Sequence, residues 1–593
     1  MKMKLFLSLL LLTFCSIAFG QNLLTEDFSS GTMPPSGWTI DAHNTNWHSS
    51  NTAHSGGTAP EADFNWSPSF TGISRLITPN INTTGYTSLT LTFHHYLDHY
   101  SGAYTIGVAT RSGGGAWMTS WSIVNPTASV GPEMIVTQIA SSDVGSSTFQ
   151  LCFFFNGYSF NINDWFFDNI SLDVSKDRDG AMVNIAVPSY SLGNGPVTGT
   201  IINMGLNPIT QATVNYKVDQ GAIHSNTFSS LNLALGATYD FTCTDLLNLT
   251  PGNYSLKVWV SNVNNLGADE NPANDTLTKT LHIASGQVAR RPLYEDFTSS
   301  TCNPCASFNN TYFNPFLLLY DDSITLIKYQ MNWPGSGDPY YTQEGYVRRM
   351  FYNVGYVPDL YVDGIQRPTD GNGLNGGYAT SIATPAFMNV NATHYFSAAG
   401  TDTSVNVHVD IMSKVTGTLT LFVALVEKVT YHNATTNGET SFHNVMMKMV
   451  PGAYGTPVDL TDGGITSVGF TTDLAGTHIE RWNDLMLAVW IQDTVTKEMF
   501  QGAYSDTIGV GIHQVQELQN VKIFPNPTSG NIFISGVKNI SLISVYDNIG
   551  SLVYETGNLS NNQLDLGFLP NGIYLVRIQT REGSITRRIT ILK

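Results

Sequence analysis

VKIFPNPTSGNIFISG (521–536), ISLISVYDNIGSLVYE (540–555) and LDLGFLPNGIYLVRIQTREGSITRRITILK (564–593) close this chain. Runs that alternate apolar and polar residues are separated there by turn-forming pairs such as Ser529-Gly530 and Asn571-Gly572. Alternation of this kind is typical of half-buried strands, and the pairs between them are typical of turns. The end of the chain therefore predicts a small antiparallel sandwich of about seven strands.

The residues at these turns are more specific than the strand pattern. In chain order they are Pro525-Asn526-Pro527, Gly530, Asp547, Gly550, Asn571-Gly572-Ile573-Tyr574 and a basic end with Arg587, Arg588 and Lys593. This order resembles the type A C-terminal sorting domain of type IX secretion cargo, over residues 521–593. The resemblance implies an Ig-like sorting domain, the type IX secretion machinery as a partner, and a protein that is secreted or held at the outer-membrane surface. The alternative is an ordinary C-terminal sandwich.

The other end of the sequence agrees with export. Lys2 and Lys4 precede an apolar run, Leu5–Phe19, which is followed by the small residue Gly20. This pattern predicts a secretory signal peptide over residues 1–20. It does not predict a membrane span, because the apolar run is too short. No later segment has the ~18 uninterrupted apolar residues that a transmembrane helix needs, so none is expected.

Composition limits the rest of the chain. Its 593 residues suggest roughly three to five domains. Charged residues make up 12% of the sequence, against about 25% in typical proteins, and turn-forming residues are abundant. These features predict a mostly β multidomain protein. The net charge of −18 argues against nucleic acid or an anionic membrane as a partner. Five cysteines are too few for a disulfide framework.

Residues 22–174 form the first predicted folded unit, with alternating strands and many tryptophans. Its landmarks are Glu26-Asp27-Phe28, Pro35-x-Gly37-Trp38 and Trp165-x-x-Asp168-Asn169-Ile170. These landmarks resemble the jelly-roll of MAM-like and cleaved-adhesin domains. The resemblance implies a structural calcium, for which Glu26 or Asp27 together with Asp168 would supply oxygen ligands. The alternative is that these acids cap turns.

A second sandwich is expected over residues 181–284. Its turns contain Pro251-Gly252-x-Tyr254 and the segment Asp269 to Asp275, DENPAND. They resemble the CARDB-type Ig-like fold, whose members act mostly as spacers or adhesive units.

The chemically reactive motif lies in RPLYEDFTSSTCNPCASFNN (291–310). The pattern places Cys302-Asn303-Pro304-Cys305 after a strand and at the start of a helix, where free N–H groups and partial positive charge stabilise a thiolate. Cys302 is therefore the expected exposed nucleophile, and Cys305 the expected resolving thiol. No other catalytic motif is recognisable.

The surroundings of this motif resemble the thioredoxin fold over residues 290–385. Pro358, in GYVPDLYVDG (355–364), takes the place of the proline that faces the cysteines in that family, and Asp296 that of its buried acid. Thr301 and Asp359 depart from the family, which usually has tryptophan and threonine there, and this puts the redox chemistry in doubt.

Residues 386–508 predict a further β-sandwich. Together with the thioredoxin-like part, over 290–508, they resemble the outer membrane protein twenty-eight-related family, whose members are surface-exposed antigens.

Two functions stay open. The first is adhesin-like binding or display, with an extracellular glycan or protein ligand and a structural disulfide. The second is an extracytoplasmic thiol–disulfide oxidoreductase that uses Cys302, Cys305, Asp296 and Pro358.

Overall fold

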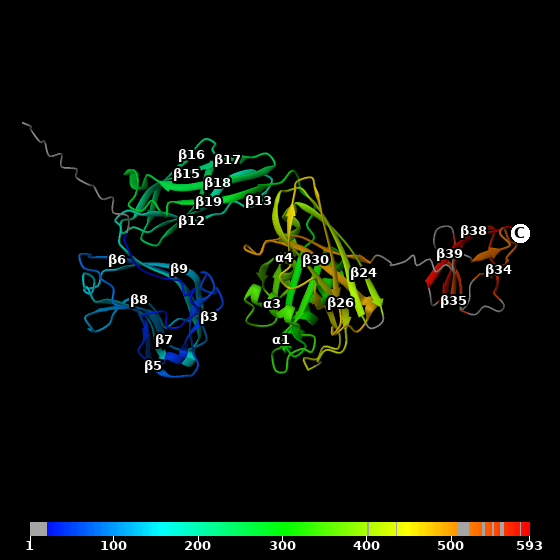
Figure 1. Cartoon of the computed structure of the whole chain (residues 1–593), viewed down its shortest axis with the longest axis horizontal. Coiled ribbons are helices and arrows are strands. Elements are labelled where there is room, and N and C mark those ends of the chain that lie inside the picture. Colours follow the sequence, from blue (N-terminus) through cyan, green and yellow to red (C-terminus); the bar gives the residue numbers. More distant parts are fainter. Residues whose placement is uncertain are drawn as a thin grey trace, which may run out of the picture. The chain divides into compact units, whose positions relative to one another are not determined.

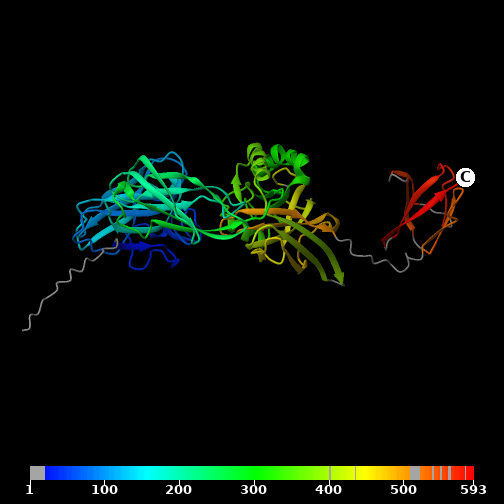
Figure 2. The ribbon, with the colours of Figure 1, turned by 90° about the horizontal axis from the view of Figure 1, so that it is seen from above.

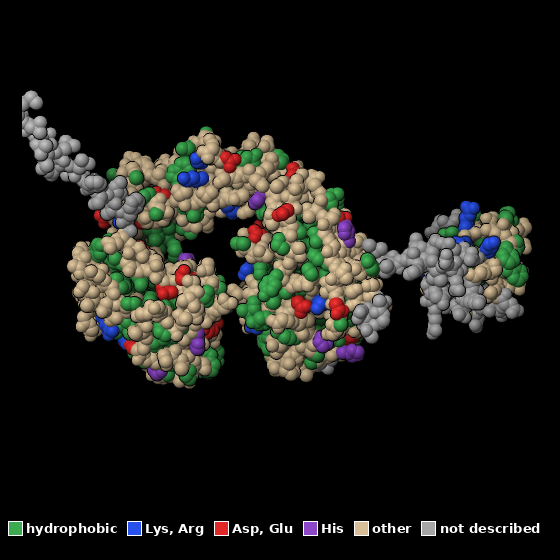
Figure 3. Space-filling model, viewed as in Figure 1, with side chains coloured by type: hydrophobic (Ala, Val, Ile, Leu, Met, Phe, Trp, Pro, Cys, Tyr) green, Lys and Arg blue, Asp and Glu red, His purple; other side chains and the backbone are tan. Residues whose placement is uncertain are grey.

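The computed structural model describes residues 21–399, 402–434, 436–507, 521–536, 540–547, 551–557, 562–580 and 583–593. The predicted signal peptide lies outside these residues. Over the described part the chain is mostly β and forms many sheets, which confirms the predicted β-rich architecture (Figures 1 and 2). No described helix is long and apolar enough to cross a membrane. Uncharged surface dominates the face seen in Figure 3, as the low content of charged residues predicts.

Contacts divide the chain into two compact units. The first contains the described residues up to 391, together with 410–468 and 478–504. The second contains 392–409, 469–477 and the described residues from 505 onward.

The N-terminal part of the first unit is a sandwich of two sheets. Its strands are β1 (Asn22–Glu26), β2 (Thr39–Ile40), β3 (Trp47–Ser50), β4 (Glu61–Asn65), β5 (Thr71–Ile77), β6 (Leu89–His99), β7 (Tyr104–Ser112), β8 (Met118–Val124), β9 (Val130–Ile139), β10 (Phe149–Tyr158) and β11 (Ile162–Val174), with the 3-10 turns η1 (Asn44–Asn46) and η2 (Ser159–Asn161). The sheets have the orders β3-β4-β11-β6-β9, with β1 on β11, and β2-β5-β10-β7-β8. Aromatic rings fill the space between them. Phe153 of β10 stacks on Phe167 of β11 with their centroids 4.5 Å apart.

A second sandwich follows. Its strands are β12 (Gly180–Ile185), β13 (Tyr190–Ser191), β14 (Asn194–Asn203), β15 (Ile209–Val218), β16 (His224–Leu233), β17 (Thr238–Asn248), β18 (Gly252–Ser261) and β19 (Thr276–Ile283), with the turn η3 (Val263–Asn265). The sheets have the orders β12-β14-β17 and β13-β19-β18-β15-β16. Aliphatic side chains from both sheets form its core, and Cys243 is buried there as a free thiol.

The reactive motif belongs to a third, α/β part of this unit. Its elements are β20 (Leu293–Thr298), α1 (Asn303–Phe308), η4 (Asn309–Phe313), α2 (Asn314–Tyr320), η5 (Asp321–Ser323), β21 (Thr325–Gln330), α3 (Gln343–Tyr352), β22 (Asp359–Val362), β23 (Ile365–Arg367), α4 (Gly371–Ala383), β26 (Gly417–Thr430), β27 (Phe442–Met449), β28 (Thr456–Leu460), η6 (Trp482–Asp484), β30 (Leu485–Gln492) and β31 (Met499–Tyr504). They build one sheet of order β23-β22-β20-β21-β27-β26-β30-β31, with β28 on β26.

Two hydrophobic clusters show how the helices cover this sheet. Apolar residues of α1, α2 and α4 pack on one face of β20 and β22, around Tyr294 and Val362. Tyr352 of α3 packs on the opposite face, against Phe297 and Tyr329. The sheet continues past the predicted boundary between residues 385 and 386, because β21 pairs in parallel with β27 at Lys328 and Val445.

The second unit includes strands of one sheet and the C-terminal sandwich. The sheet has β24 (Met388–Ala399), β25 (Asp402–Ser413), β29 (Ile465–Asp473) and β32 (Asp506–Thr507), in the order β29-β25-β24-β32. The sandwich has β33 (Lys522–Phe524), β34 (Asn531–Ser535), β35 (Ile540–Tyr546), β36 (Leu552–Thr556), β37 (Gln563–Asp565), β38 (Gly572–Thr580) and β39 (Gly583–Ile591). Its two sheets, β33-β34-β37 and β36-β35-β38-β39, are antiparallel, as the turn pattern predicts.

Candidate functional site

The two cysteines of the reactive motif lie at the start of α1. Cys302 is the N-cap of this helix, and its sulfur accepts a hydrogen bond from the backbone N–H of Cys305 at 3.1 Å. Pro304 suits the first turn because that turn needs no N–H donor there. In the structure the two cysteines form a disulfide.

Two of the other predicted site residues lie close to this motif. The carbonyl oxygen of Val357, which precedes Pro358 through a cis peptide bond, is 3.6 Å from the sulfur of Cys302. Asp296 lies on β20, the strand that leads into the motif, and is completely buried. Burial raises the pKa of Asp296 to about 6, although Lys328 on β21, with Nζ 3.4 Å away, favours the charged form.

Cys302 itself is buried, so the prediction of an exposed nucleophile is wrong. The exposed fraction of Cys302 is 1%, and that of Cys305 is 0%. Two segments contact the backbone around Cys302. The first is residues 331–342, between β21 and α3, and the second is residues 431–434 and 436–441, between β26 and β27. We call these two segments the cover loops.

The second cover loop is bonded directly to the motif. The side-chain amide of Asn437 lies 3.3 Å from the carbonyl oxygen of Cys302 and 3.4 Å from that of Ser299. The backbone N–H of Asn437 donates to the carbonyl oxygen of Ser300 at 3.2 Å. These bonds hold the loop over the segment that enters α1.

Asp338 joins the first cover loop to the second. Its carboxylate accepts from the backbone N–H of Ser300 at 3.1 Å, and from the side-chain amide of Asn433 at 3.0 and 3.1 Å. Because Asp338 and Asn433 are both buried, breaking this link would leave polar groups without partners.

A buried chain of polar groups connects Asp296 to the same loop. Lys328 donates to the side-chain oxygen of Asn309 at 2.5 Å, and the amide of Asn309 donates to Glu439 at 3.0 Å. The other oxygen of Glu439 accepts from Asn437 at 2.7 Å. Asp296 therefore contacts the Lys328 ammonium directly, and Glu439 is linked to it through Asn309.

The expected calcium ligands make contacts of another kind. Glu26 and Asp27 accept from the backbone N–H groups of Phe28 and Ser29, at 2.8 and 3.1 Å, so both acids cap the turn after β1. One oxygen of Asp168 accepts from the N–H of Thr58 at 2.9 Å, and the other is buried without a partner. Burial raises the pKa values of Glu26 and Asp168. Within the described residues, no group of three or more His, Cys, Asp or Glu side chains is placed to hold a metal.

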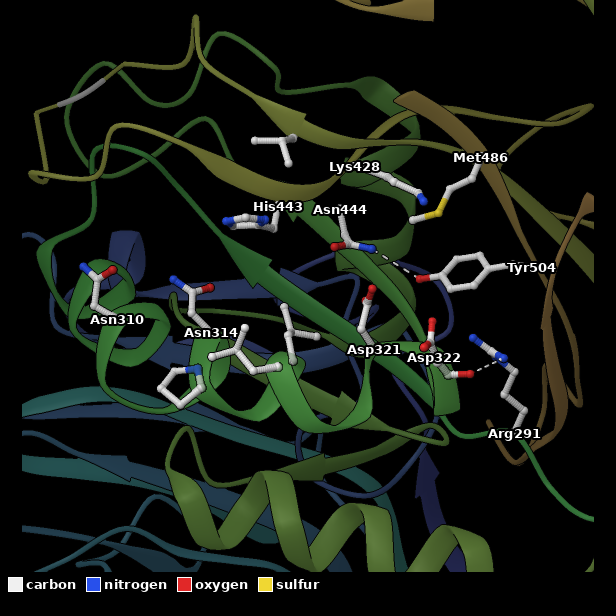
Figure 4. Close-up of a pocket in the computed structure, with 14 residues that line it drawn as sticks. Arg291, Asn310, Asn314, Asp321, Asp322, Lys428, His443, Asn444, Met486 and Tyr504 are labelled. Carbon is white, nitrogen blue, oxygen red and sulfur yellow. Dashed lines mark hydrogen bonds between the residues drawn. The ribbon is translucent and has the colours of Figure 1, made fainter. Parts of the chain in front are cut away.

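A separate groove of about 750 Å³ lies at the end of the helical layer (Figure 4). Arg291 donates to the backbone oxygen of Asp322 at 2.8 Å, and Asn444 donates to the hydroxyl of Tyr504 at 3.3 Å across its wall. The predicted catalytic residues do not line this groove. Its lining mixes both charges with apolar side chains and defines no single chemistry.

Comparison with protein families identifies the end of the chain. Residues 522–592 match the model of the secretion system C-terminal sorting domain. This match confirms the predicted sorting domain and the predicted localisation: the protein is exported to the cell surface or secreted. It also implies the type IX secretion machinery as a partner. No curated protein matches the sequence.

Solved structures give only distant likenesses. The K3 cleaved adhesin domain of Lys-gingipain from Porphyromonas gingivalis is 17% identical, covering 26% of this chain and 99% of that one, with a TM-score of 0.20. A CARDB domain from Pyrococcus furiosus, in complex with two metal ions, is 17% identical, covering 18% and 89%, with a TM-score of 0.15. A family 11 carbohydrate-binding module from Clostridium thermocellum is 14% identical, covering 26% and 96%, with a TM-score of 0.19. At these scores the likenesses carry no argument about ligands.

Proposed function

We propose that this protein is an adhesin-like binding protein of the cell surface or the extracellular medium, and that its Cys302–Cys305 disulfide is structural. In this proposal, residues 22–174 are a jelly-roll, 181–284 an Ig-like module, 290–385 a thioredoxin-like domain, 386–508 a β-sandwich and 521–593 the sorting domain. The observation that carries it is the burial of Cys302, whose neighbouring backbone is bonded to the cover loops.

This burial removes what an exchange catalyst needs. Thiol–disulfide exchange requires a thiolate to reach a disulfide sulfur directly, and the reduced enzyme needs an accessible thiolate of its own. In this chain the nucleophile position is 1% exposed. This burial favours a disulfide that persists outside the cell and fastens the start of α1.

The reduction potential of the disulfide tests the proposal. The mature protein would be equilibrated with dithiothreitol buffers, and its thiols counted by alkylation. The double variant Cys302→Ala, Cys305→Ala is the control for the two buried free cysteines. A structural bridge should titrate below about −300 mV. A value between about −270 and −120 mV, together with reduction of insulin, would contradict it, because exchange catalysts fall in that range.

The second candidate function, an extracytoplasmic oxidoreductase, is favoured by one specific observation. The cis Val357–Pro358 segment lies beside the Cys302 sulfur, as it would in a thioredoxin-like substrate site. For this function, the cover loops would have to open before Cys302 could attack a substrate disulfide. The same insulin-reduction assay, repeated with a variant whose cover loops make fewer bonds to the motif, distinguishes the two functions.

A further inference from the structure

Four exposed aromatic side chains gather at one end of the N-terminal sandwich. Trp66 is 41% exposed, Tyr100 57%, Tyr158 45% and Phe160 42%. We call these four side chains the aromatic platform. Single exposed apolar residues are ordinary on a protein surface, but contiguous groups mark places where something binds.

The rings of the platform touch one another around Phe160. Trp66 lies 5.5 Å from Phe160 and Tyr100 lies 5.6 Å from it, both edge to face, and Tyr158 stacks at 6.0 Å. Trp66 follows β4, Tyr100 follows β6, Tyr158 ends β10, and Phe160 lies in η2. Three separate chain segments, after β4, after β6 and from β10 into η2, therefore converge on one small apolar surface.

Backbone bonds fix these segments in place. The N–H of Trp66 donates to the carbonyl of Asn163 at 3.3 Å, and that of Ser101 donates to the carbonyl of Asn161 at 2.9 Å. The Ser159 hydroxyl donates to the carbonyl of Trp66 and accepts from the N–H of Phe70, both at 2.9 Å. The platform is thus organised before any ligand arrives, which lowers the entropy cost of binding.

Two aspartates lie on the strand segments that lead to the platform. Asp98 is two residues before Tyr100 on β6, and it is paired in register with Asp164 of β11. Asp164 is also paired with Asn65, the residue that precedes Trp66. An ionised carboxylate accepts hydrogen bonds and donates none, so this edge suits hydroxyl groups and repels anions.

The size of the platform narrows the class of ligand. An aromatic side chain buries about 150–250 Å² when fully covered, so four that are about half exposed offer about 400 Å². A stable protein partner needs about 800 Å² on each side. The platform is therefore too small to hold a protein by itself, but it matches a ligand of a few rings.

From these observations we propose that the aromatic platform binds a neutral oligosaccharide. Sugar rings lie with their C–H faces against the exposed aromatic rings, whose faces carry negative charge density, and sugar hydroxyls donate to Asp98 and Asp164. The inference rests on the proposed binding function and gives that function a ligand class.

Titration of the exported chain with defined sugars tests this assignment. The probes are cellohexaose, laminarihexaose, mannohexaose and xylohexaose as neutral ligands, and hexagalacturonate as an acidic one, with tryptophan fluorescence and calorimetry as readouts. We expect at least one neutral probe to bind, and hexagalacturonate not to bind. Trp66→Ala and Phe160→Ala should each weaken binding by about 10-fold.

Tyr454→Ala is the matched control, because this tyrosine is 82% exposed but lies far along the chain, between β27 and β28. It should bind as the unchanged protein does, and melting curves of all three variants should overlap. Binding of no neutral probe, or equal binding by all variants, would overturn the assignment. If the protein bound another protein and no sugar, and if Trp66→Ala abolished that binding, the proposed ligand class would be overturned. The proposed binding function would stand. Insulin reduction would overturn the proposed function whatever the sugars do.

Discussion

Replacing Asn437 with alanine should open the Cys302–Cys305 disulfide to reductants. The Asn437 amide is the direct side-chain link between the second cover loop and the motif, through the carbonyls of Cys302 and Ser299. It also satisfies one oxygen of the buried Glu439. Without this amide, the carbonyls of Cys302 and Ser299 keep their backbone donors, the N–H groups of Ala306 and Cys302. The Glu439 oxygen loses its donor as long as the loop stays closed.

The structure sets the size of the effect. A buried acceptor left without a partner costs about 1–3 kcal/mol. Opening the loop gives the Glu439 oxygen access to water, so the cost falls on the closed state alone and the opening equilibrium shifts by about 5- to 150-fold. If reduction proceeds through local opening, its rate should rise by the same factor.

The assay is reduction by excess dithiothreitol, stopped at intervals by alkylation and followed by mass spectrometry of the peptide that contains both cysteines. The two free cysteines, Cys152 and Cys243, lie on other peptides and report global unfolding. Asn310→Ala is the matched control, since Asn310 is exposed in the segment after α1. Asn433→Ala should act as Asn437→Ala does, because it cuts the link to Asp338. If both cover-loop variants are reduced within twofold of the control, the loops do not protect the disulfide and the reasoning fails.

Three further predictions concern stability. Burial, with the charges of Asp164 and Glu61, raises the pKa of Asp63 to about 8, so the folded state holds a proton there that the unfolded state has lost above pH 4. Asp63 therefore lowers the free energy of unfolding as the pH rises from about 4 to 8. Over that range Asp63→Asn should become more stable relative to the unchanged protein, as measured by urea unfolding at pH 4 and at pH 8. The same difference in unfolding free energy at both pH values would contradict this. The double variant Cys302→Ala, Cys305→Ala should lose about 2 kcal/mol of unfolding free energy, which is the loop entropy that so short a bridge removes from the unfolded chain. Its urea unfolding curve should match that of the dithiothreitol-reduced protein. A loss near zero would show that the bridge does not stabilise the fold. Removing calcium with EGTA should leave the melting temperature unchanged, because Glu26 and Asp27 accept hydrogen bonds in a turn. A structural ion at 100 times its Kd would add about 2.7 kcal/mol to the stability, so a clear fall in melting temperature would support the calcium prediction.

Local patterns predicted part of the candidate site. A strand followed by Cys-Asn-Pro-Cys defines a helix start within a few residues, because capping and the first helical turn depend only on neighbours in sequence. The structure accordingly places Cys302 at the N-cap of α1. The sorting domain was predictable for the same reason, since its turn residues and alternating strands are local signals.

The cover over the disulfide was not predictable in this way. Asn437 is 135 residues from Cys302 in the sequence, and Asp338 is 38 residues from Ser300. Asparagine and aspartate are ordinary loop residues, so nothing in their own surroundings marks them as partners of the motif. The exposed position assigned to Cys302 came from the motif alone and was wrong because exposure depends on the folded surroundings of the motif, which include parts of the chain far away in sequence.

The pairing of β21 with β27 explains why residues before and after the predicted boundary between 385 and 386 lie in contact. It brings the strand that follows the second cover loop next to β21, whose Lys328 already contacts Asp296. Glu439 then joins Asn309 and the Lys328 ammonium in one buried chain. The loop between β26 and β27 is bonded in this way to the backbone of the motif. In the function proposed above, the accessibility of Cys302 depends on these neighbouring strands and their connections, and the residues of the motif alone do not settle whether it reacts.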